Sequence, residues 1–271
     1  MKTVAFQGEQ GAYSENAVYQ FFGKTAKVKP CKDFRNVFES VKKQEVQAGV
    51  VPVENSIEGS VNQNYDLFFT YDLKVCGEVI VKIEHCLIAN LGTALADIKV
   101  VYSHPQALAQ CQTFLEEFGR ELIPTYDTAG SVKMLKEKGL NNAAAIASER
   151  AANIYDMHIL AKDIADNPEN YTRFFVLSKE DSPPTGKDKT SIIFSAAHKP
   201  GSLYHALGEF AKRDINLTKI ESRPTKQTPW EYNFYLDFEG HRSEKRCAEA
   251  LNALEKYAAF IKVLGSYPKA T

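Results

Sequence analysis

The sequence lacks the cysteine and histidine patterns of disulfide-rich and metal-binding proteins. Its five cysteines are scattered, odd in number and without CxxC spacing, which argues against a disulfide framework or a zinc site. Its six histidines form no HxxxH-type pair. His85 and Cys86 adjoin in a predicted strand, where neighbouring side chains face opposite ways, so one metal ion could not easily take both. We expect reduced thiols, as in a cytosol, and no metal.

An excess of charge of one sign is also missing. Lys and Arg number 33 against 34 Asp and Glu, so the net charge is -1, and no basic stripe is present. Nucleic acid and anionic membranes are therefore not expected partners. No apolar run approaches membrane-spanning length, and Met1-Lys2 leads directly into a strand-like Thr3–Phe6 without a signal peptide. The sequence predicts a cytoplasmic protein of one large or two ordinary domains.

The first polar loop follows the strand Thr3–Phe6 and contains Gly8 and Gly11. A helix is predicted from Glu15 to Phe22, with Ser14 as its N-cap. A strand, a loop and a helix N-terminus in that order present backbone N–H groups to an anion. Only two glycines are in place, so this is no dinucleotide fingerprint, and an ordinary βα turn remains an alternative.

A second polar loop, Glu54-Asn55-Ser56, follows the buried-type strand Gly49–Val53. Pro52 should end hydrogen bonding along that strand, and Ser60 has the spacing of a capping box for a helix through about Phe69. Open α/β sheets bind ligands in such loops. A well-capped turn would explain Ser60 but not the three polar residues together, so we favour a functional loop.

A second lobe is expected to begin in the long β-rich run Leu73–Ile88, broken near Gly77. Further along, Ser103 is predicted to cap a helix that runs to about Phe118. Gln110 lies one turn after Gln106 on the same face of this helix. For His104 we favour a cap-region histidine with a satisfied backbone hydrogen bond over a catalytic role. The alternation of strands and helices predicts parallel sheets with helices on both faces and a cleft between two α/β lobes.

The strand Tyr171–Leu177 places Thr172 and Phe174 on one face and Arg173 on the other. An Arg among aromatic residues is costly to bury unless an anion pairs with it. Taken alone, Arg173 is better explained by an internal carboxylate or by solvent than by a ligand. The alternative is an anion clamp with a hydroxyl beside it.

The pattern changes after a proline- and glycine-containing linker at residues 182–189. A strand, a helix with a stripe from Leu203 to Phe210, a strand Leu217–Ser222, a turn Arg223–Pro229, a strand, a helix and a last strand follow. The order βαββαβ is that of a ferredoxin-like unit. It predicts a separate domain, which could equally be a bare dimerisation module.

Five motifs in this order closely resemble prephenate dehydratase with a C-terminal ACT regulatory domain, across essentially the whole chain. They are Gly8-x-x-Gly11-x-x-Ser14-Glu15, Val51-Pro52-Val53-Glu54-Asn55-Ser56-x-x-Gly59-Ser60, Ser103-His104-Pro105-Gln106-Ala107-Leu108, Asn170-x-Thr172-Arg173-Phe174 and Glu221-Ser222-Arg223-Pro224. The resemblance implies a two-lobed catalytic domain, shaped like a periplasmic binding protein, over residues 1–181. Lobe one would hold about 1–75 plus 165–181 and lobe two about 76–164; residues 190–271 would form the ACT domain.

The resemblance also implies roles for individual residues. Catalytic roles fall to Thr172, Arg173 and Asn55, and substrate binding to Ser14, Glu54, Ser56, Ser103, Gln110 and Phe174. The effector site would comprise Gly201, Ser202, Leu203, Tyr204, Glu221, Ser222, Arg223 and Pro224. Two positions depart from the family: Ala12 replaces the usual Thr, and Gly201-Ser202-Leu203-Tyr204 replaces the usual Gly-Ala-Leu-Val.

The activity implied is the decarboxylating dehydration of prephenate to phenylpyruvate, without a cofactor and with feedback inhibition by L-phenylalanine. A homo-oligomer, dimer or tetramer, is expected through the ACT domains, because a βαββαβ unit leaves a sheet edge and one face to cover. Three alternatives remain open: an arogenate dehydratase, a non-catalytic solute-binding protein and a purely regulatory amino-acid sensor.

Overall fold

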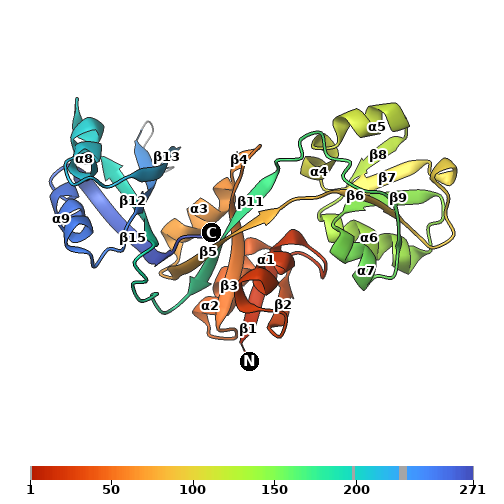
Figure 1. The fold of residues 1–271 in the computed structure, drawn as a ribbon, viewed down its shortest axis with the longest axis horizontal. Coiled ribbons are helices and arrows are strands. Elements are labelled where there is room, and N and C mark those ends of the chain that lie inside the picture. The colour runs from red at the N-terminus through yellow and green to blue at the C-terminus, as the bar shows by residue number, and fades with distance from the viewer. Residues whose placement is uncertain (1, 197–198, 226–230, 271) are drawn as a thin grey trace. The chain divides into compact units, whose positions relative to one another are not determined.

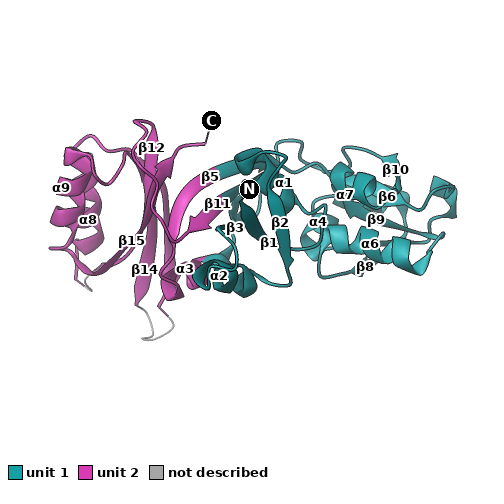
Figure 2. Ribbon diagram, turned by 90° about the horizontal axis from the view of Figure 1, so that it is seen from below, with its two compact units in different colours: residues 1–64, 79–174 teal, residues 65–78, 175–271 magenta. Residues whose placement is uncertain are grey.

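The computed structural model describes residues 2–196, 199–225 and 231–270. The chain divides into two compact units, residues 1–64 with 79–174 and residues 65–78 with 175–271 (Figure 2). Strands β5 (Lys74–Lys82) and β11 (Tyr171–Ser178) each contribute residues to both units. Each unit is described separately below.

The first sheet carries the N-terminal part of the chain (Figure 1). Its strand order is β2-β1-β3-β11-β5, with β4 paired to β3. The strands other than β5 and β11 are β1 (Thr3–Gln7), β2 (Lys27–Cys31), β3 (Ala48–Asn55) and β4 (Gly59–Ser60). The helices are α1 (Tyr13–Phe22), α2 (Phe34–Lys42) and α3 (Asn62–Thr70). Buried Val4 and Phe6 of β1, Val50 of β3, and Val37 and Phe38 of α2 form its apolar core.

The second sheet lies within the first unit and has the order β10-β6-β9-β7-β8. Its strands are β6 (Cys86–Ala89), β7 (Val100–Ser103), β8 (Glu121–Pro124), β9 (Ala143–Ala147) and β10 (His158–Ala161). Its helices are η1 (Leu95–Asp97), α4 (Pro105–Ala109), α5 (Gln112–Phe118), α6 (Thr128–Lys138) and α7 (Glu149–Ile154). Two lobes, each built on its own sheet, are therefore present.

The prediction of a parallel second sheet is wrong at one strand. β7 pairs in parallel with β8 and β9, but β6 is antiparallel to both β9 and β10. Only residues 83–85 separate β6 from β5, with no helix between the two strands. A helical βαβ crossover makes the strands that it joins parallel, and β6 is not preceded by one. The β-rich run Leu73–Ile88 is therefore interrupted at residues 83–85. The predicted break near Gly77 is wrong, because Gly77 lies inside β5.

The predicted helix from Ser103 to Phe118 is two helices, because a distant carboxylate caps the second. The Oδ2 and Oδ1 atoms of Asp166 accept hydrogen bonds from the backbone N–H groups of Gln112 (2.9 Å) and Thr113 (3.0 Å). A side chain from outside the helix thus satisfies the first donors of α5. α3 starts at Asn62, and Ser60 pairs with Glu54 in the short β3–β4 ladder. β3 also continues through Pro52 to Asn55.

The C-terminal residues confirm the predicted βαββαβ order. The elements are β12 (Asp188–Ala196), α8 (Ser202–Ala211), β13 (Leu217–Pro224), β14 (Tyr232–Glu239), α9 (Lys245–Leu254) and β15 (Ala258–Pro268), in the antiparallel sheet β13-β14-β12-β15. Buried residues of the sheet and both helices, among them Phe194, Phe210 and Phe238, form one core. β13 extends to Pro224, beyond the predicted end at Ser222, and residues 226–229 of the predicted turn lie outside the described residues.

Within the second unit, this sheet also packs against earlier parts of the chain. The rings of Tyr267 and Phe175 lie 5.4 Å apart, and those of Tyr235 and Tyr65 lie 4.6 Å apart. Lys262 donates from Nζ to the carbonyls of Phe68 (2.9 Å) and Tyr71 (2.8 Å). Residues 65–78 and 175 therefore cover part of the face of this sheet, a face for which the sequence predicts a cover by a second subunit.

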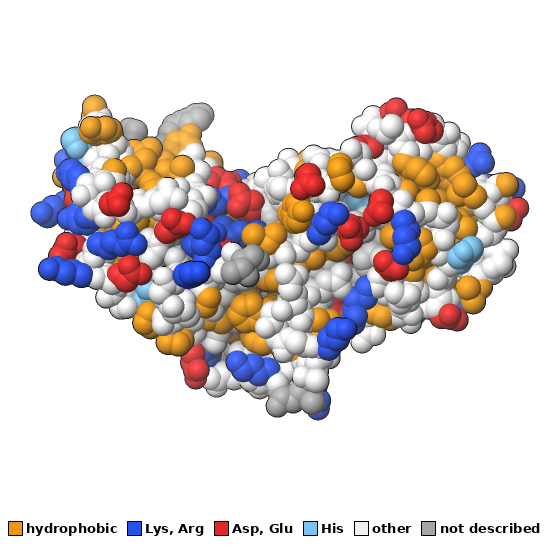
Figure 3. Space-filling view, in the orientation of Figure 1, with side chains coloured by type: hydrophobic (Ala, Val, Ile, Leu, Met, Phe, Trp, Pro, Cys, Tyr) orange, Lys and Arg blue, Asp and Glu red, His pale blue; other side chains and the backbone are white. Residues whose placement is uncertain are grey.

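The surface carries charges of both signs. On the face shown in Figure 3, Lys and Arg side chains are interspersed with Asp and Glu side chains. Within the described ranges, no helix is both long and apolar enough to cross a bilayer.

Candidate active site

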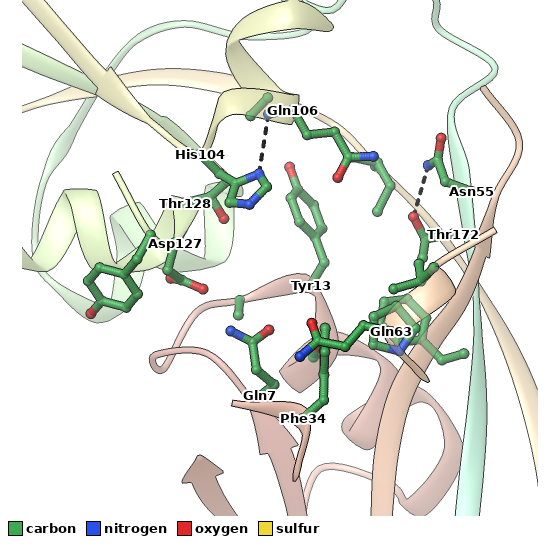
Figure 4. A pocket seen from close by; sticks show the side chains of 18 of the residues that line it. Gln7, Tyr13, Phe34, Asn55, Gln63, His104, Gln106, Asp127, Thr128 and Thr172 are labelled. Atoms are coloured by element: carbon green, nitrogen blue, oxygen red, sulfur yellow. Dashed lines mark hydrogen bonds between the residues drawn. The ribbon is translucent and has the colours of Figure 1, made fainter. Parts of the chain in front are cut away.

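A cavity of about 460 Å³ lies in the first unit; strands of the first sheet line it together with loops and helix starts of the second lobe. This volume is within the usual range for small-molecule sites. Figure 4 shows Gln7, Tyr13, Gln63, His104 and Thr172 around a common space. Of the substrate-site residues expected from the sequence, Ser14, Asn55, Gln110, Thr172 and Phe174 line it.

Thr172 presents its hydroxyl group to the cavity from the start of β11. Its Oγ1 accepts a hydrogen bond from Nδ2 of Asn55 at 3.0 Å (Figure 4), so the hydroxyl hydrogen remains available for a ligand. Phe174 follows on the same face of the strand, is 2% exposed, and contributes an apolar wall. The alternation predicted for this strand therefore holds at the site.

Asn55 is held in one orientation by the turn that follows β3. Its Oδ1 accepts hydrogen bonds from the backbone N–H groups of Ile57 and Glu58, both at 3.0 Å. Since a backbone N–H can only donate, Oδ1 must face the turn and Nδ2 must face away from it. One hydrogen of Nδ2 is donated to Oδ1 of Asn170 at 2.7 Å, and the other is shared between Thr172 Oγ1 at 3.0 Å and the Tyr171 carbonyl at 3.1 Å.

A chain of hydrogen bonds continues from Asn170 into the second lobe. Nδ2 of Asn170 and Nε2 of His85 each lie 2.9 Å from Oε1 of Gln110. Nδ1 of His85 lies 3.1 Å from the hydroxyl of Tyr13, which donates to the Glu84 carbonyl at 2.5 Å. Burial lowers the pKa of His85, with an opposing contribution from its bond to Gln110, and burial raises the pKa of Tyr13 well above its usual value.

Four predicted residues lie outside the cavity lining. Nη1 of Arg173 faces Oε2 of Glu54 at 3.7 Å, on the strand face opposite Thr172. Ser56 connects the turn after β3 to the start of β11. Its Oγ donates to the Glu169 carbonyl and accepts from the Tyr171 N–H. Ser103 is fully buried and donates to the Ile146 carbonyl at 2.6 Å. Direct substrate contacts by these four residues remain predictions.

Both predicted caps next to the site are wrong. α1 begins at Tyr13, its N-cap is Ala12, and Ser14 lies inside the first turn, where it lines the cavity. α4 is capped by His104, whose Nδ1 accepts from the Gln106 N–H at 3.2 Å, while Ser103 belongs to β7. The predicted cap position of His104, with its backbone hydrogen bond, is therefore confirmed, and His104 also lines the cavity. In both cases the helix starts one or two residues away from the serine that propensity alone selects.

Sequence reasoning missed several lining residues. Lys32 is the only lysine or arginine among the described residues that line the cavity, and it follows directly on β2. The position after the carboxyl end of a parallel strand was an available signal for it. Asp127 was also missed; it caps α6 by accepting the Gly130 N–H at 2.6 Å, and burial raises its pKa.

A second cavity, of about 520 Å³, lies at the start of α8 in the second unit. Ser202 and Leu203, both predicted effector residues, line it. Tyr204 is 76% exposed and is not part of the lining, and Gly201 is the left-handed N-cap of α8. Glu221, Ser222, Arg223 and Pro224 lie in β13, where Glu221 pairs with Lys219 at 3.2 Å.

The sequence matches two protein families. Residues 4–182 match the prephenate dehydratase family, and residues 190–256 match the ACT domain. An Arabidopsis thaliana protein called arogenate dehydratase/prephenate dehydratase 2, chloroplastic, is 45% identical over 98% of this chain and 72% of its own length. The bifunctional chorismate mutase/prephenate dehydratase of Aquifex aeolicus is 45% identical over 98% of this chain and 74% of its own length.

Solved structures share the whole fold. The prephenate dehydratase of Arthrobacter aurescens, in complex with L-Phe, has a TM-score of 0.90 at 35% identity over 98% of this chain and 90% of that one. A structure described as GqqA, a novel type of quorum quenching acylase, also has a TM-score of 0.90, at 33% identity over 100% of this chain and 98% of that one. The chain belongs to the prephenate dehydratase family and carries a C-terminal ACT domain.

Proposed function

We propose that the protein converts prephenate to phenylpyruvate, carbon dioxide and water, and that L-phenylalanine inhibits it through the ACT domain. The observation that carries this proposal is the Thr172 hydroxyl, held by Asn55 and backed by Phe174 in the cavity of the first unit. Family membership and the L-Phe complex of the Arthrobacter aurescens relative support it. Arogenate is the alternative substrate, because the Arabidopsis thaliana relative is named for both activities.

The reaction needs no redox step. The bond from the ring to its carboxylate breaks, and its electron pair completes the aromatic ring as the hydroxyl group at the opposite ring carbon departs. One proton converts that hydroxyl to water, so the enzyme must supply or relay a proton and bind two carboxylates. Neither task requires a cofactor.

Thr172 is proposed as the hydrogen-bond donor to the departing hydroxyl. Asn55 occupies one lone pair of the Thr172 oxygen, so the hydroxyl hydrogen points away from Asn55 and can be donated to a ligand in the cavity. A positioned proton donor contributes about 10²–10⁴-fold to a rate. The apolar wall made by Phe174 weakens solvation of the ring carboxylate and so favours its loss.

Lys32 and the N-terminus of α1, at Ala12, Tyr13 and Ser14, are proposed to bind the carboxylates. Gln110 adds an amide donor. We assign Arg173 a positioning role, because its partner Glu54 directly precedes Asn55 at the end of β3. Glu54 and Ser56 would then hold the end of β3 against β11, and Ser103 would hold β7 against β9.

Ser202 and Leu203 are proposed to contact the effector, since they line the cavity beside α8. We propose a homo-oligomer, dimer or tetramer, joined through ACT domains, because β13 and β15 are the edges of the sheet. Cytoplasmic location is proposed from the five cysteines, all of which are free thiols.

The test is turnover of prephenate and of arogenate, each measured with and without L-phenylalanine. Phenylpyruvate formation that L-phenylalanine suppresses is the expected result. Faster turnover of arogenate would assign that substrate instead. Absence of turnover on both substrates would reject the proposed dehydratase activity and favour an amino-acid sensor. Hydrolysis of an acylated substrate, without turnover of prephenate or arogenate, would favour the activity named for the acylase structure.

A further inference from the structure

We propose that Asn170 and His85 are positioning residues that hold the Gln110 amide with its oxygen inward and its NH2 group toward the cavity. Gln110 would then bind a hydrogen-bond acceptor of the substrate, either a carboxylate or the side-chain ketone. This inference deepens the proposed function and rests on it.

The direction of the hydrogen bonds is set far from Gln110, at two backbone amides. The N–H groups of Ile57 and Glu58 fix Oδ1 of Asn55, so Nδ2 of Asn55 donates to Oδ1 of Asn170. The other amide atom of Asn170, Nδ2, must then donate to Gln110. The Gln110 atom that receives it is an oxygen, because two NH2 groups cannot bond to each other.

His85 adds the second donor to the same oxygen. Since Oε1 of Gln110 is an acceptor, Nε2 of His85 at 2.9 Å carries a hydrogen and Nδ1 is an acceptor. The single hydrogen of the Tyr13 hydroxyl is then shared between Nδ1 of His85 at 3.1 Å and the Glu84 carbonyl at 2.5 Å. Both lone pairs of Oε1 are thus engaged, from Asn170 on one side and His85 on the other. The titratable members of this hydrogen-bonded series are His85 and Tyr13. Burial lowers the pKa of His85, and burial, with further contributions from Cys86, Cys111 and Glu84, raises the pKa of Tyr13, so both are neutral near pH 7.

The NH2 group of Gln110 is left for the ligand. Gln110 lines the cavity, and its Nε2 forms no hydrogen bond with any other described residue. Asn170 is fully buried and His85 is 2% exposed, so neither could be replaced by solvent as a donor to Oε1. The orientation is therefore built into the fold before a substrate arrives.

Asn170→Asp is the decisive variant, because it keeps the acceptor for Asn55 and removes only the donor to Gln110. The ionised carboxylate would attract the Gln110 NH2 group and turn its oxygen toward the substrate. We expect kcat/KM for prephenate to fall about 10- to 100-fold at high pH, the effect of losing one hydrogen bond to a charged group. Activity should recover as pH falls, because the protonated carboxyl again donates. Loss that is independent of pH would overturn the proposal.

Asn90→Asp is the matched control. Asn90 is also a buried asparagine, and its Nδ2 donates to the carbonyls of Leu135 and Leu140, away from the cavity. It should lower thermal stability and leave kcat/KM unchanged. If it reduces kcat/KM to the same extent as Asn170→Asp, the effect is general destabilisation and the proposal is wrong.

Nitrogen NMR of the His85 ring tests the orientation without any activity assay. The wild-type protein should show the Nε2–H tautomer near neutral pH, assigned by the signals missing from His85→Gln. Asn170→Asp at high pH should shift it to the Nδ1–H tautomer, because the turned Gln110 then donates to Nε2. An Nδ1–H tautomer in the wild type would overturn the proposal. The Nε2–H tautomer in a protein that does not turn over prephenate would locate the failure in the proposed function.

Discussion

At the scale of single residues, hydrogen-bond direction matters more than proximity. Thr172 and Arg173 are neighbours in β11, yet only Thr172 lines the cavity. Asn55 accepts from two backbone amides and donates to Thr172, so it decides which way that hydroxyl points. A substitution that preserves shape but not hydrogen bonding is therefore the informative one.

Thr172→Val keeps the shape of the side chain and removes its hydroxyl. We expect kcat to fall about 10²–10⁴-fold with little change in thermal stability, because the hydroxyl is the proposed hydrogen-bond donor to the leaving group. Thr172→Ser, which retains a hydroxyl, should keep most of the activity. Steady-state kinetics with prephenate measures both variants. Near-normal turnover by the valine variant would remove Thr172 from the mechanism.

His85 should make stability depend on pH. Burial lowers its pKa from the ordinary 6.5, so the unfolded chain takes up the proton at a higher pH than the folded protein does. The contribution to the unfolding free energy is complete above about pH 6.5 and is lost as pH falls toward the folded pKa. Chemical denaturation from pH 7.5 to 5 should show a smaller acid loss for His85→Gln than for the wild type. Equal losses would mean that His85 is not buried as a neutral ring.

At the scale of secondary structure, α1 and α7 bring the two lobes of the first unit together at Gly11. Ser148, the N-cap of α7, donates from Oγ to the Gly11 carbonyl at 2.7 Å. Gly11 has a φ of +92°, and a Cβ there would lie 2.7 Å from Cα of Ala151. Arg150 also pairs with the buried Glu15 of α1, with Nε 3.3 Å from Oε2. The loop after β1 is thus shaped by its contact with α7.

Gly11→Ala should open this contact. We expect a loss of about 1–3 kcal/mol from backbone strain alone, a further loss from the clash with Ala151, and a raised KM. Gly23→Ala is the control, since Gly23 has a φ of +82° but nothing within 4 Å of the added Cβ. Thermal unfolding and kinetics of the two variants separate strain from lobe contact. An unchanged KM in Gly11→Ala would show that the contact does not matter for substrate binding.

At the scale of the whole molecule, the two units share β5 and β11. Thr172 lies in the part of β11 that belongs to the first unit, and Phe175, three residues later, packs on Tyr267 of the ACT sheet in the second. A single strand therefore contains both a candidate catalytic residue and a contact with the regulatory domain.

Leu203→Ala should weaken inhibition by L-phenylalanine roughly 10-fold, because it removes apolar contact area from the cavity beside α8. Tyr204→Ala is the matched control, since that side chain is 76% exposed and outside the cavity lining. Inhibition curves at a fixed prephenate concentration give both values. A strong effect of Tyr204→Ala alone would contradict the assignment of the effector to this cavity.

Patterns along the chain predicted the family, the order of elements in the ACT domain and the alternation that puts Thr172 and Phe174 on one face of β11. Local spacing suffices for these features, because side-chain direction in a strand follows from period two and motif order follows from the chain. The predicted site residues Ser14, Asn55 and Gln110 also line the cavity.

Only the tertiary structure decided the features that depend on residues far apart in the sequence. Asp166 caps α5 through a hydrogen bond to Gln112, 54 residues earlier in the sequence. Asn170 donates a hydrogen bond to Gln110, which is 60 residues away. The reversal of β6, the pairing of Arg173 with Glu54 and the covering of the ACT sheet by residues 65–78 are of the same kind. Hydrogen bonds and packing partners of this range are set by how the lobes and sheets fold together, and no local pattern encodes them.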